Sequence, residues 1–362
     1  MSSIGKMRGL ARLADADGHF RMVALDQRPP MFEALAKARG VTKDDVRFEE
    51  VVAAKRLLVE ALSPHCSSML LDPNYAVPAA IDILPPRCGL IVTLEDHRTE
   101  ETNGGRRSRV ITNWSVDKIR ALGADAVKVL AWYRPDADAA VVAHQKQFVR
   151  AIGDDCQRND IPYVLELLVY PFAGTASHTA DYVESPDKLP NLVIESVREF
   201  VKPEYGVDLL KLESPIAVAQ LPDRGTGCRE QVAQATFSIV GDLCREHGIP
   251  WVLLSGGAAK DKFELVLDYA YAAGASGFLA GRTIWLNAVQ SNFPDLQKLE
   301  AALRTESVDV LSRLSALTKE KACTWSTRYP KGDSIAAEGD FAKAYAPARF
   351  EVSRGQANVA SI

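Results

Sequence analysis

The sequence predicts an α/β fold, a single-domain TIM (β/α)8 barrel with a C-terminal helical extension. Eight short apolar runs rich in β-branched residues recur along the chain without clean alternation, which indicates parallel strands covered on both faces. Segments with helical spacing separate them, as in a barrel of βα units. No run precedes a Gly-x-Gly-x-x-Gly pattern, which disfavours the alternative, a doubly wound dinucleotide-binding sheet. The predicted strands are Arg21–Asp26, Ser67–Asp72, Gly89–Glu95, Asp125–Leu130, Tyr163–Leu168, Val207–Glu213, Trp251–Ser255 and Ser276–Gly281.

Amphipathic segments between these runs predict the helices. Val51–Leu62 has apolar residues at helical spacing, whereas Trp114–Leu122 and Lys260–Ala273 each end at a glycine that suits a C-cap. Residues 295–320 predict a charged amphipathic helix that completes the barrel domain, which we place at residues 1–322. Residues 323–362 are expected to form a packed extension or a tail.

Composition excludes several classes of function. The chain has 362 residues, 47% of them hydrophobic, and a net charge of −4, so no basic excess indicates nucleic-acid binding. Neither a secretory signal nor a membrane-spanning run is expected. The six cysteines lack CxxC spacing, which argues against a zinc or redox motif and favours free thiols in the cytoplasm. Histidines without partners at metal spacing predict no metal, and no cofactor is expected.

Three charged residues interrupt the most apolar strands. Lys128, Glu166 and Lys211 lie in the fourth, fifth and sixth predicted strands, which are neighbours in a barrel. Side chains alternate across a strand, so all three can point inward near the upper mouth. Asp26 ends the first predicted strand and faces the same mouth. A buried charge is costly unless it is paired or neutralised, so the row predicts a constructed site.

Such a row can perform amine chemistry. Burial and a nearby cation favour the neutral amine of a lysine, so Lys128 can activate Lys211 as a nucleophile while Glu166 moves protons. The amine would add to a ketone and form a protonated Schiff base, which permits cleavage of the neighbouring C–C bond. A structural ion-pair network inside the barrel explains the same three residues equally well.

The ends of the last two strands favour the catalytic interpretation. A Ser-Gly-Gly turn, Ser255 to Gly257, follows the seventh strand, and Gly281 with Arg282 follows the eighth. TIM barrels often bind phosphate with these two loops, because glycine lets backbone N–H groups approach the anion. The guanidinium of Arg282 suits phosphate oxygens, although ordinary βα turns with a salt-bridged arginine remain the alternative.

These residues resemble the class I aldolases of the tagatose-1,6-bisphosphate aldolase family, whose relatives include sulfofructose-phosphate aldolases. The resemblance spans roughly residues 10–330 in order and spacing. It rests on residues 24–28, 67–75, 123–130, 165–170, 208–215, 253–257 and 277–285.

The resemblance implies a Schiff-base TIM barrel without a metal. Lys211 matches the Schiff-base lysine, while Lys128 and Glu166 match the helper lysine and the acid/base glutamate. Asp26 and Gln27 match a motif in which the aspartate assists proton transfer at the hydroxyl beside the cleaved bond. The residues that match the binding site for the dihydroxyacetone-phosphate end are Ser255, Gly256, Gly257, Gly281 and Arg282.

Residues 94–109 depart from the sugar-bisphosphate members. Four arginines of this loop could hold a second anion, a phosphate or a sulfonate, or could simply be solvated. His97 in the same loop could shuttle protons or face solvent. The four arginines are Arg98, Arg106, Arg107 and Arg109.

The expected activity is reversible cleavage of a ketose 1-phosphate or 1,6-bisphosphate into dihydroxyacetone phosphate and an aldehyde. The candidate substrates resemble tagatose 1,6-bisphosphate or sulfofructose 1-phosphate, and the partner class is a small sugar phosphate bound by a homo-oligomer. The alternatives are a non-covalent phosphosugar isomerase or lyase and a non-catalytic sugar-phosphate sensor. Stereochemistry and the terminal group of the aldehyde are not determined by the sequence.

Overall fold

Eight parallel strands close into a barrel in the computed structural model, which describes residues 3–173 and 190–327. Each strand pairs with its neighbours along the chain, and the last pairs with the first, as the sequence predicts. The barrel strands are β1 (Phe20–Leu25), β2 (Ser68–Leu71), β3 (Gly89–Thr93), β6 (Ala126–Trp132), β7 (Tyr163–Leu168), β8 (Leu209–Leu212), β9 (Trp251–Leu254) and β10 (Gly277–Ala280).

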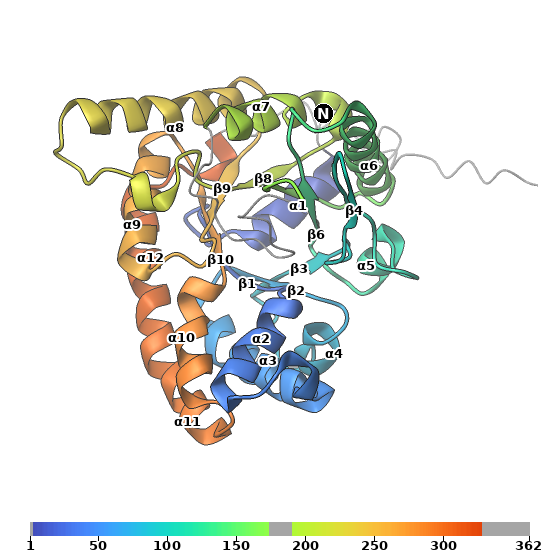
Figure 1. The fold of residues 1–362 in the computed structure, drawn as a ribbon, viewed down its shortest axis with the longest axis vertical. Helices are drawn as coiled ribbons and strands as arrows, with labels where there is room; N and C mark the ends of the chain where they lie inside the picture. Colours follow the sequence, from blue (N-terminus) through green and yellow to red (C-terminus); the bar gives the residue numbers. More distant parts are fainter. Residues whose placement is uncertain (1–2, 174–189, 328–362) are drawn as a thin grey trace, which may run out of the picture.

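Helices surround the strands, and Figure 1 shows them on the outside of the barrel. The main apolar core lies between this helical layer and the outward faces of the strands. The helices are α1 (Ile4–Leu13), α2 (Pro29–Arg39), α3 (Phe48–Leu62), α4 (Ala76–Ala80), α5 (Val116–Ala121), α6 (Ala139–Arg158), α7 (Pro190–Phe200), α8 (Cys228–Glu246), α9 (Lys260–Ala272), α10 (Arg282–Asn292), α11 (Leu296–Ala302) and α12 (Val308–Lys321). Within the described residues, no helix is both long and apolar enough to cross a membrane.

Three predicted helices form with shifted ends. α3 begins before residue 51, because the Glu50 carboxylate accepts the backbone N–H of Arg47 at 2.8 Å and caps the first turn. α5 begins later than predicted, after Ser115, whose hydroxyl accepts the N–H of Lys118. The helix expected over residues 295–320 consists of α11, a π-helical turn over Leu303–Ser307, and α12.

The loop after β3 contains a two-stranded hairpin that the sequence analysis did not predict. Its strands are β4 (Glu100–Thr102) and β5 (Gly105–Arg107), and they pair in antiparallel fashion. The Tyr170 hydroxyl accepts the backbone N–H of Arg106 at 2.9 Å, which fixes the hairpin to the loop after β7.

Apolar side chains fill the barrel interior and its lower end. Leu10 and Leu13 of α1 belong to the same buried cluster as Phe20 and Met22 of β1. Trp325 joins this cluster, with its ring centroid 6.5 Å from that of Phe20. Residues 323–327 therefore pack on the barrel, whereas the rest of the predicted extension, 328–362, lies outside the described residues. The boundary after residue 322 stays a prediction.

Candidate active site

A layer of charged side chains lies directly above the apolar interior. Ala24, Ala126, Val164 and Leu209 are buried in the interior cluster. Two residues further along each chain segment come Asp26, Lys128, Glu166 and Lys211, all of which line one cavity at the upper mouth. Because side chains alternate with a period of two, the apolar residue below each charge sets its inward direction.

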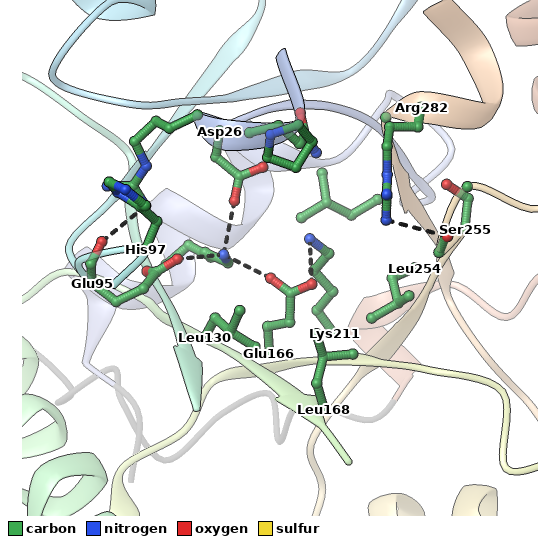
Figure 2. Close-up of a pocket in the computed structure, with 18 of the residues that line it drawn as sticks. Asp26, Glu95, His97, Leu130, Glu166, Leu168, Lys211, Leu254, Ser255 and Arg282 are labelled. Carbon is green, nitrogen blue, oxygen red and sulfur yellow. Dashed lines mark hydrogen bonds and ion pairs between the residues drawn. The ribbon is translucent and has the colours of Figure 1, made fainter. Parts of the chain in front are cut away.

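Glu166 connects the two lysines. One of its carboxylate oxygens lies 2.9 Å from Lys211 Nζ, and the other lies 2.7 Å from Lys128 Nζ. Lys128 Nζ also contacts Asp26 at 2.8 Å and Glu95 at 2.7 Å. Figure 2 shows the carboxylates of Asp26, Glu95 and Glu166 converging on one amine. The structure thus brings together all four residues predicted to be catalytic.

The three carboxylates keep Lys128 charged. Burial disfavours its ammonium form, but the charges of Asp26, Glu166 and Glu95 outweigh burial and raise the pKa of Lys128 well above its ordinary value. Burial also opposes ionisation of Asp26, yet Lys128 and Lys211 hold the pKa of Asp26 well below its usual range. Lys128 is therefore a fixed cation and Asp26 a fixed carboxylate at neutral pH.

Glu95 is a site residue that the sequence analysis did not single out. Its side chain is buried, and its second carboxylate oxygen accepts the Thr93 hydroxyl at 2.6 Å. The signal was present, because residue 95 shares the inward phase of Ile91 and Thr93 on β3.

The predicted phosphate residues lie together on the wall across the cavity from Glu95 and His97 (Figure 2). Gly256 and Gly257 adopt left-handed φ values of 57° and 84°, which side chains other than glycine rarely tolerate. Arg282 donates to the carbonyl of Gly256 at 3.2 Å, which joins the loops after β9 and β10. At Gly281 a Cβ atom would lie 2.6 Å from the carbonyl oxygen of Ala24, so only glycine permits this approach to β1.

Gln27 also lines the cavity, so all of the predicted catalytic and phosphate-binding residues are part of its wall. The rest of the wall combines apolar side chains with two further basic groups, Arg28 and His97. Arg28 is buried and donates to the carbonyl of Glu95 at 3.0 Å, while its Nε has no hydrogen-bond partner among the described residues. The apolar part of the wall consists of Pro29, Pro30, Leu130, Trp132, Leu168, Leu254 and Leu279.

The four arginines predicted to hold a distal anion are not among the residues that line this cavity. Arg106 is buried, pairs with Glu101 at 2.7 Å, and stacks 4.6 Å from the ring centroid of Trp132. Arg107 pairs with Glu100, and Arg109 with Asp96. Arg98 is exposed. Arg28, from the loop after β1, does line the cavity.

Within the described residues, no group of three or more His, Cys, Asp or Glu side chains is arranged to hold a metal ion. The carboxylates at the mouth instead surround the ammonium of Lys128. Independence from a metal or cofactor stays a prediction.

The barrel and its lysine–carboxylate network define a TIM-barrel enzyme site at the C-terminal ends of the strands. Residues 21–287 match the family model described as DeoC/LacD family aldolase. The chain belongs to this family of lyases, which confirms the resemblance seen in the sequence.

Curated relatives match most of the chain. A tagatose 1,6-diphosphate aldolase of Listeria monocytogenes is 31% identical over 337 residues, covering 91% of this chain and 96% of the relative. Tagatose 1,6-diphosphate aldolase 1 of Streptococcus mutans is 30% identical over 325 residues, covering 88% of this chain and 97% of the relative.

Solved structures share the fold at low sequence identity. The fructose-bisphosphate aldolase of Plasmodium falciparum, in complex with TRAP and an inhibitor, has a TM-score of 0.59 at 13% identity and covers 90% of this chain and 95% of its own. An archaeal fructose-1,6-bisphosphate aldolase has a TM-score of 0.54 at 16% identity and covers 86% of this chain and 98% of its own. These likenesses support the barrel assignment.

Proposed function

We propose that this protein is a class I aldolase that reversibly cleaves a ketose 1-phosphate or 1,6-bisphosphate into dihydroxyacetone phosphate and an aldehyde. The observation that carries the proposal is the buried ion-pair chain from Lys211 through Glu166 to Lys128 and Asp26. The tagatose 1,6-diphosphate aldolases among its relatives support a ketose 1,6-bisphosphate as substrate.

Lys211 is the proposed nucleophile. Its neutral amine adds to the ketone carbon, and loss of water leaves a protonated imine between Lys211 and the substrate. The imine then accepts the electron pair of the breaking C–C bond, which yields an enamine and releases the aldehyde. Lys211 contacts one carboxylate, whereas Lys128 contacts three, so Lys211 is the amine that can give up its proton.

Glu166 is the proposed proton carrier of the first steps. It lies within hydrogen-bond distance of the Lys211 amine, where it can accept a proton before addition and return it to the departing water. Its contact with Lys128 keeps a positive charge beside it throughout.

Asp26 is the proposed base at the bond that breaks. Lys128 and Lys211 hold its pKa low against burial, so Asp26 is ionised when the substrate binds. As the C–C bond breaks, the neighbouring hydroxyl becomes the oxygen of a protonated aldehyde, which is acidic enough to give its proton to this weak base. It stands at the end of β1, within 2.8 Å of Lys128. Cleavage therefore moves a proton from the substrate hydroxyl to Asp26 as the aldehyde forms.

The two ends of the cavity suit two anionic groups. The phosphate of the dihydroxyacetone end fits beside Gly256, Gly257 and Arg282, where backbone N–H groups and a guanidinium meet. Arg28 lines the cavity beside Glu95, to whose carbonyl it donates, and its guanidinium is the proposed contact for the anion at the far end of the sugar. A terminal phosphate and a terminal sulfonate both meet this requirement.

A cleavage assay tests the proposal. Tagatose 1,6-bisphosphate, fructose 1,6-bisphosphate and sulfofructose 1-phosphate are each supplied, and release of dihydroxyacetone phosphate is measured. Lys211→Met should abolish release, and Glu166→Gln should lower kcat by about 10²–10⁴-fold. EDTA should have no effect. Full cleavage by Lys211→Met, or loss of activity with EDTA, would contradict the mechanism.

We also infer a cytoplasmic homo-oligomer. All six cysteines lie in the described part of the chain and are free thiols, which supports a reducing compartment. Val232 and Ile239 are exposed on one face of α8, seven positions apart, which supports a contact between subunits. Light scattering of the purified protein tests the assembly, and a monomer would contradict it.

A further inference from the structure

A second buried lysine lies behind the end of β1, on the helical side of the barrel wall. Lys55 of α3 donates to the carbonyl of Leu25 at 2.9 Å and to that of Gln27 at 2.8 Å, and it pairs with the carboxylate of Asp72. The side chains of Lys55 and Asp72 are both 0% exposed. An ammonium group has three N–H donors, so these partners use all of them.

The two carbonyls flank Asp26. β1 ends at Leu25, and Lys55 holds the peptide unit that precedes Asp26 and the peptide unit that follows Gln27. The short segment that carries Asp26 is therefore tied at both ends, which restricts the direction of the Asp26 Cα–Cβ bond toward the carboxylate position 2.8 Å from Lys128. Lys55 itself does not line the cavity, so it does not touch the substrate; it acts on Asp26 through this backbone and through its nearby charge.

Asp72 holds the Lys55 ammonium in place. One of its oxygens accepts the N–H groups of Asn74 at 2.9 Å and Tyr75 at 2.7 Å, and the other accepts that of Ala76 at 3.3 Å. These hydrogen bonds form the turn at which α4 begins, and they hold the carboxylate in place. Every member of the network is satisfied, so loss of Lys55 would leave two carbonyls and a buried carboxylate without their partner.

We infer that Lys55 is a positioning residue that holds Asp26 in register with the bond being cleaved. The inference rests on the proposed function, since that function gives Asp26 its role in proton transfer. Schiff-base formation depends on Lys211 and Glu166, neither of which Lys55 contacts. Cleavage and adduct formation should therefore respond differently to the loss of Lys55.

Lys55→Met is the direct test. It should lower kcat for cleavage by about 10²-fold, because misplacing a catalytic group by about 1 Å has an effect of that size. KM should change little, and borohydride with dihydroxyacetone phosphate should still trap the adduct on Lys211. Loss of trapping in proportion to cleavage would overturn the inference.

Lys6→Met is the matched control. Lys6 of α1 is equally buried, and it pairs with Asp208 at 2.8 Å before β8, at the opposite end of the barrel. Both variants should lower the denaturant midpoint, whereas only Lys55→Met should lower kcat per folded molecule. Equal kcat values for the two variants would mean that Lys55 only stabilises the fold, which would overturn the inference.

A double-mutant cycle measures how much of the effect of Lys55 on kcat depends on Asp26. In an Asp26→Asn background, Lys55→Met should add little further loss of kcat, because the group that it positions has already been removed. Fully additive losses would overturn the inference. Should Lys55→Met not fold, Asp72→Asn replaces it in all three measurements, because the amide keeps an oxygen for the turn and removes the charge that pairs with Lys55.

Wild-type protein separates this inference from the proposed function. If wild type neither cleaves nor traps any of the three ketose phosphates, the proposed function fails and the inference fails with it. If wild type does both, the comparison of Lys55→Met with Lys6→Met decides the inference alone.

Discussion

Two lysines with similar strand contexts have different surroundings at the residue scale. Lys128 and Lys211 each lie two residues after an inward apolar residue. Lys128 contacts three carboxylates, whereas Lys211 contacts one. The carboxylate of Glu166 contacts both lysines. When Glu166 takes the proton of Lys211, the ammonium of Lys128 beside it keeps Asp26 and Glu95 as partners, so the transfer leaves no buried charge unpaired.

His97 should make the protein sensitive to acid. Burial and the nearby Arg28 lower its pKa to about 4, against about 6.5 for an unperturbed histidine. Between about pH 6.5 and 4 the unfolded chain binds a proton that the folded protein does not, so stability falls as pH falls through this window. In His97→Asn that fall should be smaller by on the order of 1 kcal/mol between about pH 7 and 5, after allowance for partial exposure.

Urea unfolding at several pH values measures this effect. The curve of stability against pH should fall more steeply for wild type than for His97→Asn as the pH is lowered. Parallel curves would show that His97 takes up its proton equally in the folded and unfolded states.

Strand elements account for the part of the site that the sequence predicts best. A strand alternates with a period of two, so an apolar residue that must face the interior also sets the direction of the charge above it. This rule placed Lys128, Glu166 and Lys211 correctly, and it could have placed Glu95. Arg106 follows no such rule, because its guanidinium stacks on Trp132 and pairs with Glu101, its cross-strand partner within the hairpin.

The turn after β9 should bind phosphate through its left-handed glycines. Gly257→Ala places a side chain at a φ of 84° and 3.4 Å from Arg282, so it should raise KM for a phosphorylated ketose. Stability should fall by about 1–2 kcal/mol, the usual cost of a left-handed residue with a side chain.

Gly225→Ala is the matched control for this turn. Gly225 has a φ of 81°, and a Cβ atom there would meet nothing within 4 Å. It should lose similar stability by denaturant unfolding while KM stays unchanged. An unchanged KM in Gly257→Ala would remove this turn from the phosphate site.

At the scale of the whole molecule, residues that stabilise the fold and residues proposed to react lie at opposite ends of the barrel. The lower end is closed by α1 and Trp325, whereas the reacting groups stand at the upper end. Trp325→Ala should therefore cost about 3 kcal/mol of unfolding free energy, as expected for a buried tryptophan, with kcat unchanged at temperatures where the variant is folded. A selective loss of kcat without a loss of stability would contradict this division.

The barrel was predictable because its βα units have local patterns, a short apolar run followed by residues at helical spacing, with a glycine after two of the predicted helices. Contacts between distant segments were not. Neither Lys55 clamping the end of β1 nor α1 closing the lower end follows from local patterns, since both depend on which elements the closed barrel brings together.

The covalent role of Lys211 is the central claim, and borohydride trapping tests it most directly. Wild-type protein is incubated with dihydroxyacetone phosphate, reduced with borohydride and mapped by peptide mass spectrometry. The account predicts one stable adduct on the peptide that contains Lys211, and none in Lys211→Met. A stable adduct on Lys128 instead, or no adduct in an enzyme that cleaves ketose phosphates, would contradict it.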